Sequence, residues 1–295
     1  MLSGPPVKLS ILMWAHNKEH TIVQAVGEVL GQQYPCGIEL IVVDDGSTDA
    51  TPALVNLIDD PRLIVHRHHE NRGRGAALTT GIALASGTHI LPFDADLEYS
   101  AEDIVKIVEP VLKGRCELVY GTRLSGYNSV YQSYRHALGN RMLTGAVNVL
   151  FNSCLSDLLT CLKLIPLGMA RQFKLRETGF GLDAELTAIL LRTGERPFEV
   201  PISYYSSAYS HGRKQWRETV SCLRILWRVR LTRATRLKVP VSQVRIDPLP
   251  ADTDAFPEVA GQSAGPASSV AGDQRGGATA GASGDGQRGQ HGLIP

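Results

Sequence analysis

Two aspartates, Asp94 and Asp96, follow an apolar run at residues 88–93. Carboxylate oxygens are the ligands that Mg²⁺ takes in proteins, often one or two of them together with the phosphates of a substrate. An isolated acidic pair is more often a solvated turn, but its position after a buried strand favours a binding site. The pair therefore predicts a site for Mg²⁺ or Mn²⁺ that also holds a diphosphate.

A second acidic strand end, Asp44 and Asp45, lies earlier in the chain. Asp followed by Gly and Ser also favours a turn or a helix cap. Both interpretations can hold together, because a carboxylate at a strand end can accept hydrogen bonds from a nucleotide. The glycine-rich loop 71–77 brings Arg72 and Arg74 to the start of a helix, which predicts an anion site for a diphosphate.

The elements that must position these residues alternate between strand and helix periodicity. We predict strands at 7–13, 39–43, 63–66, 88–93, 118–121, 162–165 and 200–205. We predict helices at 21–32, 52–59, 75–85, 101–112 with Ser100 as its N-cap, 134–156, 181–192 and 218–230. This alternation indicates a mostly parallel α/β sheet, whose ligands bind at the carboxyl ends of the strands.

Composition excludes some classes of protein. The 295-residue chain is 43% apolar and has a net charge of +1, which suits a buried core and argues against nucleic acid as a partner. Its five cysteines form no CxxC pair, as expected of a reduced, cytoplasmic protein. We recognise no signal peptide and no apolar stretch of membrane-spanning length, so we expect no membrane span.

The character of the chain changes toward its end. Nine Lys or Arg residues and one acid lie between 213 and 238. A basic amphipathic helix predicted at about 216–233 suits either an anionic membrane surface or ordinary packing with arginines in water. From 247 to 295 Gly, Ala, Ser and Pro dominate, so we predict a disordered tail after a single domain at 1–240.

Several short motifs occur along the chain in a fixed order: 10–13, Asn17, 42–49, 73–77, 94–99, 121–123, 157–163, 179–185 and 200–205. Together they resemble glycosyltransferase family 2, of the GT-A fold, and within it the dolichol- or polyprenyl-phosphate sugar synthases. The resemblance runs from about residue 8 to residue 230. It implies a Rossmann-like, mostly parallel sheet flanked by helices, and inverting transfer of a sugar from a nucleotide-sugar donor.

The resemblance also implies roles for single residues. The donor would contact Asn17, Asp44, Asp45, Arg74 and Asp94, and the metal would bind Asp94 and Asp96. The acceptor phosphate would contact Arg123, Arg213 and Lys214, with Asp157 and Asp183 as the catalytic carboxylates. Asp183 and Glu185 lie on different faces of one helix, so one of them can face solvent, and we expect Asp183 to be the site residue.

The acceptor decides what catalysis requires. A hydroxyl must lose a proton as it attacks, which calls for a carboxylate base, whereas a phosphate monoester is already anionic at neutral pH. With a phosphate acceptor, Asp157 or Asp183 would position the reactants more than deprotonate them. We therefore predict a metal-dependent transferase that moves a sugar from a GDP-mannose, UDP-glucose or UDP-GlcNAc type donor to a polyprenyl or dolichyl phosphate, working peripherally on the inner face of the membrane.

Departures from the family pattern leave alternatives open. His16 and Lys18 stand where relatives have Tyr and an acid, Leu159 replaces a Glu, and Ser207 replaces an Arg. A natural-product glycosyltransferase is one alternative, for example one that transfers N-acetylglucosamine from UDP-GlcNAc to a small soluble acceptor in antibiotic or nucleoside biosynthesis. A non-catalytic nucleotide-sugar binding protein is the other.

Overall fold

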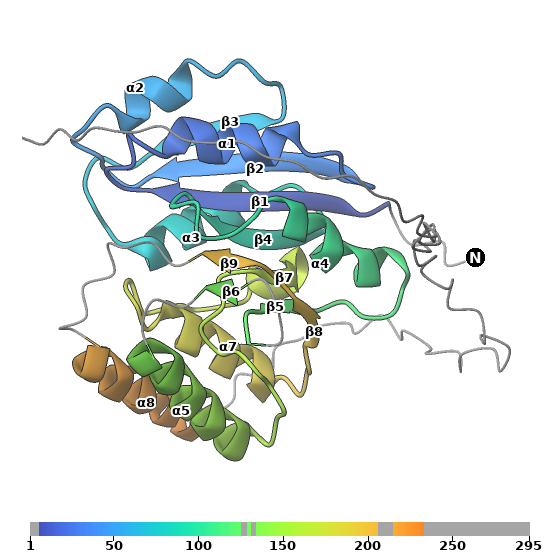
Figure 1. Ribbon diagram of the computed structural model, residues 1–295, viewed down its shortest axis with the longest axis vertical. Helices are drawn as coiled ribbons and strands as arrows, with labels where there is room; N and C mark the ends of the chain where they lie inside the picture. Colours follow the sequence, from blue (N-terminus) through green and yellow to red (C-terminus); the bar gives the residue numbers. More distant parts are fainter. Residues whose placement is uncertain (1–5, 125–128, 131–133, 206–214, 233–295) are drawn as a thin grey trace, which may run out of the picture. The chain divides into compact units, whose positions relative to one another are not determined.

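The computed structural model describes residues 6–124, 129–130, 134–205 and 215–232 (Figure 1). Internal contacts divide the chain into two units, 1–246 and 247–295, and every described residue belongs to the first. The predicted end of the domain at 240, the predicted tail and the predicted phosphate ligands Arg213 and Lys214 lie outside the described residues. These three interpretations stay predictions.

A seven-stranded sheet with strand order β3-β2-β1-β4-β7-β5-β8 forms the centre of the fold. Its strands are β1 (Lys8–Ala15), β2 (Gly37–Asp44), β3 (Leu63–Arg67), β4 (His89–Asp94), β5 (Val119–Thr122), β7 (Lys163–Pro166) and β8 (Phe198–Pro201). Only β7 runs antiparallel to its neighbours β4 and β5, and the other pairs are parallel. The structure thus confirms the predicted mostly parallel α/β sheet.

The helices and two short strands complete the described part of the chain. The helices are α1 (Ile22–Gly31), α2 (Thr51–Asn56), α3 (Arg74–Leu84), α4 (Glu102–Leu112), α5 (Tyr134–Phe151), α6 (Leu167–Ala170), α7 (Leu182–Arg192) and α8 (Gln215–Leu231). The strands β6 (Ser129–Val130) and β9 (Tyr204–Tyr205) pair with each other in a separate small sheet. The predicted strand 200–205 was therefore wrong as one element, because it divides between β8 and β9.

One predicted helix cap was also wrong. The N-cap of α4 is Ala101, one residue after the predicted Ser100. The Ser100 hydroxyl still accepts a hydrogen bond from the backbone N–H of Glu102 at 3.3 Å, so it satisfies a donor of the first turn from one position earlier.

Strand burial and register bring the acidic strand ends together. Every residue of β1 from Leu9 onward is buried, which requires cover on both faces of the sheet. In the register of the central strands, Ala15 lies opposite Asp44 and Trp14 lies opposite Asp94. The carboxyl ends of β1, β2 and β4 therefore meet at one edge, where α/β sheets bind their ligands.

The helices α5, α7 and α8 gather beside one another in Figure 1, and each contacts the other two. The predicted basic helix corresponds to α8, which begins three residues before Glu218 and ends at Leu231. Within the described part of the chain, none of the helices has the length and apolarity to cross a membrane.

A buried carboxylate, Glu39, ties together the opposite end of the sheet. It accepts hydrogen bonds from Lys8 Nζ at 2.8 Å, and from Ser10 Oγ and the Ser86 backbone N–H at 2.6 Å each. Burial alone would raise its pKa, but these bonds lower the pKa of Glu39 from 4.5 to about 2. The folded state therefore favours the ionised form of this side chain.

We expect Glu39→Gln to lower the free energy of unfolding by about 3 kcal/mol at pH 7. Because the pKa of Glu39 is depressed, its contribution is present above its unfolded pKa and is lost as pH falls toward 2. The difference between variant and parent should therefore shrink in urea unfolding below pH 4.5. Glu70→Gln, at an exposed carboxylate, is the matched control, and an equal difference at every pH would contradict the expectation.

Candidate active site

The turn after β4 carries the two aspartates of the predicted metal site. Asp94 ends the strand, and Asp96 Oδ1 accepts a hydrogen bond from the Glu98 backbone N–H at 3.1 Å. Between them, the Ala95 carbonyl accepts a hydrogen bond from Thr21 Oγ1 at 2.7 Å, which anchors the turn to the start of α1. Leu97 has φ 63°, a left-handed conformation that is uncommon for leucine and that often marks functional sites.

Negative charge accumulates in this turn. Burial and the neighbouring carboxylates Asp94 and Glu98 raise the pKa of Asp96 to about 7. The pKa of Asp94 is also raised, first by burial, although the nearby Arg74 opposes the shift. A divalent cation would relieve this repulsion, so the residues present fit a metal with Asp94 and Asp96 as ligands. Among the described residues, no three His, Cys, Asp or Glu side chains are grouped to hold a metal ion without a substrate.

Arg74, the first residue of α3, lies between two carboxylates. Its Nη2 is 4.0 Å from Asp94 Oδ2 and 3.7 Å from Asp183 Oδ2. The guanidinium carbon also lies over the Trp14 ring, 4.5 Å from its centroid. Burial opposes ionisation, but the Asp183 and Asp94 carboxylates outweigh it and raise the pKa of Arg74. The predicted donor residues Arg74 and Asp94 and the predicted catalytic Asp183 therefore share one charged cluster.

Lys163 completes this cluster, and sequence reasoning did not select it. Its Nζ donates to Asp183 Oδ1 at 2.7 Å and to the Thr160 carbonyl, and the side chain is 0% exposed. Asp183 thus lies between two cations, Lys163 and Arg74. One signal in the sequence could have revealed the residue: a lysine within the apolar run 162–165 of a buried strand needs a charged partner.

We expect Lys163→Met to lower kcat by about tenfold to a hundredfold, because Asp183 loses the group that fixes its position. Steady-state kinetics measure the effect, with the KM for the donor changing less than kcat. Lys113→Met removes an exposed lysine that pairs with Glu109, and we expect it to leave kcat unchanged. A kcat for Lys163→Met within twofold of the parent value would contradict this positioning role. A twofold change corresponds to only about 0.4 kcal/mol in activation free energy.

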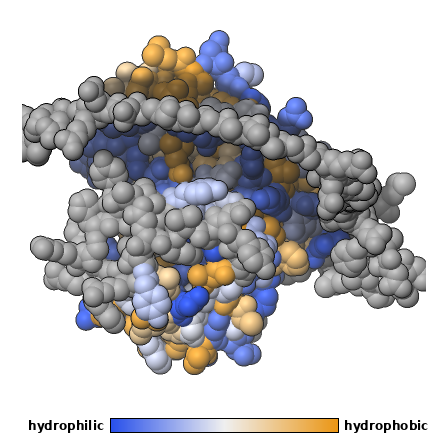
Figure 2. All heavy atoms as spheres, in the orientation of Figure 1, coloured by the Kyte–Doolittle hydropathy of each residue, from blue (hydrophilic) through white to orange (hydrophobic). Residues whose placement is uncertain are grey.

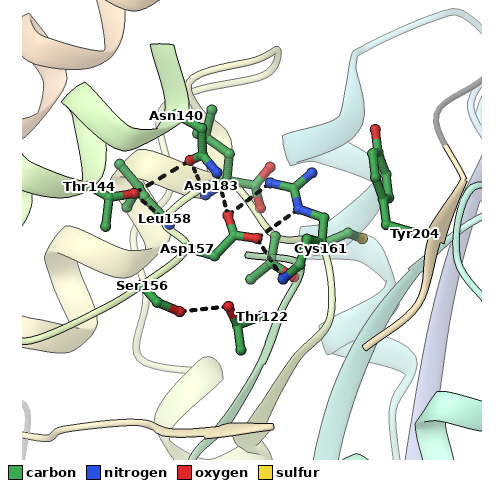
Figure 3. A network of polar contacts seen from close by, with 12 residues as sticks. Thr122, Asn140, Thr144, Ser156, Asp157, Leu158, Cys161, Asp183 and Tyr204 are labelled. Carbon is green, nitrogen blue, oxygen red and sulfur yellow. Dashed lines mark hydrogen bonds and ion pairs between the residues drawn. The ribbon is translucent and has the colours of Figure 1, made fainter. Parts of the chain in front are cut away.

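Asp157 and Arg123 form a second buried pair, with Asp157 0% and Arg123 8% exposed. Asp157 lies within the polar network of Figure 3. Asp157 Oδ2 accepts from Arg123 Nε at 2.7 Å, and Oδ1 accepts from Arg123 Nη2 at 2.8 Å and from Asn140 Nδ2 at 2.7 Å. Burial opposes ionisation, but Arg123 and Asn140 outweigh it and lower the pKa of Asp157. With both oxygens occupied, Asp157 holds Arg123 rather than presenting a free carboxylate to a substrate.

Aromatic residues connect the two charged groups. Tyr99 follows the metal-site turn, and its hydroxyl accepts hydrogen bonds from the Cys161 backbone N–H at 3.1 Å and from Arg123 Nη1 at 3.4 Å. The Arg123 guanidinium carbon lies 4.9 Å from the centroid of the Tyr204 ring, which contacts Tyr99. Figure 3 shows Asp183, Cys161 and Tyr204 around the Asp157 pair. The predicted metal-site turn and Arg123, one of the predicted acceptor residues, therefore lie in adjoining parts of the described structure.

The two aspartates at the end of β2 differ in what their carboxylates contact. Asp45 accepts hydrogen bonds from His68 Nδ1 at 2.7 Å, the Arg72 N–H at 3.0 Å and the Gly73 N–H at 2.7 Å. Asp44 Oδ1 accepts from the Ser47 N–H, and its Oδ2 lies 3.1 Å from Arg67 Nε without a hydrogen bond. Asp44 Oδ2 is thus ion-paired with Arg67 but accepts no hydrogen bond, whereas Asp45 is occupied by the loop that leads to α3.

That glycine-rich loop uses several of its backbone N–H groups within the fold. The N–H groups of Arg72 and Gly73 are bonded to Asp45, and the Gly75 N–H donates to the Thr178 carbonyl at 3.3 Å. Gly73 has φ 86°, and a Cβ there would meet the Thr178 carbonyl oxygen at 2.5 Å. These three N–H groups are therefore not free for an anion, and the predicted anion site at the start of α3 stays a prediction that depends on the side chains of Arg74 and of the exposed Arg72.

Asn17 and Glu185 also form hydrogen bonds to other segments of the fold. Asn17 Oδ1 accepts from the Thr48 N–H at 2.9 Å, so this residue joins the first loop to the loop after β2. Glu185 does not face solvent: its Oε2 accepts from the backbone N–H of Arg176 and of Glu177, and its Oε1 accepts from Arg228 Nη2 at 2.6 Å. Asp183 and Glu185 are thus both paired, on different faces of α7.

Residues 10–162 match the model of the family "Glycosyl transferase family 2". Among proteins, the chain is 38% identical over 101 residues to the succinoglycan biosynthesis protein ExoO of Rhizobium meliloti, covering 34% of this chain and 29% of that protein. It is 28% identical over 131 residues to the UDP-N-acetylglucosamine–dolichyl-phosphate N-acetylglucosaminyltransferase of Methanococcus voltae, covering 39% and 51%. The chain thus matches about half or less of the length of these relatives.

A solved structure shares the fold. Glucosyl-3-phosphoglycerate synthase from Mycobacterium tuberculosis, crystallised with Mn²⁺ and uridine-diphosphate-glucose, superposes with a TM-score of 0.62 at 19% sequence identity. The match covers 76% of this chain and 79% of that one. Likeness at this level of identity concerns the fold alone, and it confirms the predicted GT-A architecture.

Proposed function

Since the chain belongs to glycosyl transferase family 2, we propose that it transfers a sugar from a nucleotide-sugar donor to a polyprenyl or dolichyl phosphate, with Mg²⁺ or Mn²⁺ as cofactor. One observation carries this proposal: Arg74 lies within 4.0 Å of both Asp94, a proposed metal ligand, and Asp183, on the proposed acceptor side. The reaction brings a diphosphate leaving group and an attacking phosphate close together. It therefore needs cations and carboxylates of the donor and acceptor sides next to each other, as they are around Arg74.

The donor half of the site consists of the edge formed by β1, β2 and β4. Asp94 and Asp96 would hold the divalent cation, which when bound stabilises negative charge on the departing diphosphate. Arg74, whose guanidinium lies over the Trp14 ring, would contact the same diphosphate. Asp44, whose Oδ2 is ion-paired with Arg67 but accepts no hydrogen bond, would accept one from a base or ribose. Asp45, Asn17 and His68 would act by holding the surrounding loops.

The acceptor half centres on Arg123 and Asp183. A phosphate oxygen is anionic at neutral pH and needs no general base. Arg123, kept in place by Asp157, supports the acceptor phosphate electrostatically. Asp183, paired with Lys163 and next to Arg74, aligns the groups around the anomeric carbon instead of taking a proton. A single in-line displacement would invert the configuration of that carbon.

The lipid part of the proposal is supported by the named relative from Methanococcus voltae, whose acceptor is dolichyl phosphate and whose donor is UDP-N-acetylglucosamine. That relative and this chain are 28% identical over the matched region, which does not carry the donor over. The proposal therefore includes donors of the GDP-mannose, UDP-glucose and UDP-GlcNAc types.

An acceptor panel tests the proposal. Purified full-length protein with Mn²⁺ or Mg²⁺ is incubated with each donor type, with polyprenyl phosphate, with soluble phosphates and hydroxyl compounds, and without acceptor. We expect lipid-linked sugar from one donor, and chelation of the metal should abolish it. Turnover with soluble acceptors alone would overturn the lipid acceptor in favour of a natural-product enzyme, and donor binding without any turnover would favour a binding protein.

A further inference from the structure

The helices α5 and α8 lie side by side (Figure 1). Each leaves a row of apolar side chains in solvent. On α5, Leu138, Met142 and Val149 follow one another at helical spacing, and Val149 is 85% exposed. On α8 the exposed row consists of Val220, Trp227 and Leu231, with Trp227 53% and Leu231 75% exposed. We refer to these six residues as the outer apolar rows.

Basic residues flank the outer apolar rows. Arg141 lies beside Met142, Arg224 lies one turn from both Val220 and Trp227, and all three arginines, including Arg230, are exposed. Arg230 Nε donates to the Leu150 carbonyl at 3.0 Å, which holds the end of α8 against α5 beside Val149. The sequence of α5 contains no acid, and that of α8 contains only Glu218, which is partly buried. Figure 2 shows orange and blue residues intermixed in the region of these helices.

We propose that this face of α5 and α8 docks on an anionic lipid bilayer. Apolar side chains that enter the interface, with arginines beside them to meet lipid phosphates, are the pattern of a helix that lies in the plane of a membrane. Tryptophan is enriched at that depth, and arginine can bury its stem while its head stays at the phosphate level. The inference rests on the proposed function, because it gives a peripheral enzyme its way to reach a lipid phosphate.

Charge argues against a second copy of the chain as the occupant. A symmetric dimer through this face would bring Arg141, Arg224 and Arg230 of one protomer close to the same residues of the other. Like charges placed together in an interface disfavour association. An anionic lipid surface supplies the opposite charge.

The inner sides of the same helices support the proposed acceptor half of the site. From α5, Asn140 Nδ2 donates to Asp157 Oδ1, the carboxylate that holds Arg123. From α8, Arg228 pairs with Glu177 at 2.8 Å and with Glu185 at 2.6 Å. A bilayer against the outer face would therefore be separated from the residues that fix Arg123 only by the helices α5 and α8.

Vesicle flotation tests the docking without donor or acceptor. Full-length protein is mixed with phosphatidylcholine vesicles, alone or with added phosphatidylglycerol. We expect binding to the anionic vesicles only, weakened by high salt because the attraction is partly electrostatic. Arg224→Gln should weaken binding about fivefold and Trp227→Ser with Leu231→Ser by more, while Leu57→Ser, at the residue directly after α2 that is 80% exposed, should change nothing.

Equal binding to neutral and anionic vesicles, or equal binding by all variants, would overturn the proposal. Light scattering of the parent and the Trp227→Ser/Leu231→Ser variant tests whether a second copy of the chain binds this face instead. A parent that is dimeric and a variant that is monomeric would identify a second copy as the occupant. Circular dichroism checks that the variants are folded. Flotation does not depend on turnover, so bound protein that makes no lipid-linked sugar would count against the proposed function alone.

Discussion

Asp96→Asn is expected to lower sugar transfer about a hundredfold or more while the protein stays as stable as its parent. The carboxylate is one of two proposed metal ligands, and charge stabilisation of a leaving diphosphate typically contributes several kcal/mol to the rate. Stability should not fall, because burial and the nearby Asp94 and Glu98 raise the pKa of Asp96 to about 7, so the fold disfavours its ionised form, and Asn carries no charge. Loss of function without loss of stability distinguishes a metal ligand from a structural residue.

Product formation across a Mn²⁺ titration measures the first effect, and thermal unfolding without metal measures the second. Asp59→Asn is the matched control, because this exposed aspartate ends no strand of the site. Direct Mn²⁺ binding, followed by electron paramagnetic resonance with a nucleoside diphosphate, should be lost in Asp96→Asn and kept in Asp59→Asn. Unchanged transfer by Asp96→Asn would remove this residue from the metal site.

Asp157→Ala is expected to lower the free energy of unfolding by about 3–5 kcal/mol, because Arg123 would remain buried without its partner. Transfer should be lost as well, since Arg123 would no longer be held by two hydrogen bonds to one carboxylate. Urea unfolding and kinetics measure these effects separately. The single variant cannot by itself separate instability from misplacement of Arg123.

The double variant Arg123→Met/Asp157→Leu makes that separation. Replacing both members of a buried ion pair by apolar residues is often neutral for stability, so most of the loss should be recovered. Transfer should stay absent, because the proposed contact to the acceptor phosphate is gone. Recovery of transfer together with stability would show that the pair is structural and that Arg123 does not touch the acceptor.

Much of the fold could be predicted from local pattern. β1 and α7 begin and end within two residues of the predicted bounds, because a continuous apolar run or a helical period marks them clearly. β6 and α6, with two and four residues, are too short to show any period and were missed. β8 and β9 were merged because the apolar pattern continues across the bend between them.

The candidate site was predictable where strand order alone determines which residues meet. Asp44 and Asp94 end parallel strands that flank β1, so their meeting at one edge follows from strand order. The partners of the charged residues were not predictable in this way. Lys163 reaches Asp183 across twenty positions and Asn140 reaches Asp157 across seventeen, and no local period relates such residues.

The sequence by itself determined the α/β architecture, the family and the acidic pair that ends β4, since hydrophobic period and motif order are local properties of the chain. Only the tertiary structure decided which carboxylates have free oxygens. Asp45 and Asp157 are occupied by donors from other segments, whereas Asp96 stands among like charges. That difference arises from burial and from the cations that packing brings near each group, and neither is encoded in the spacing of the residues.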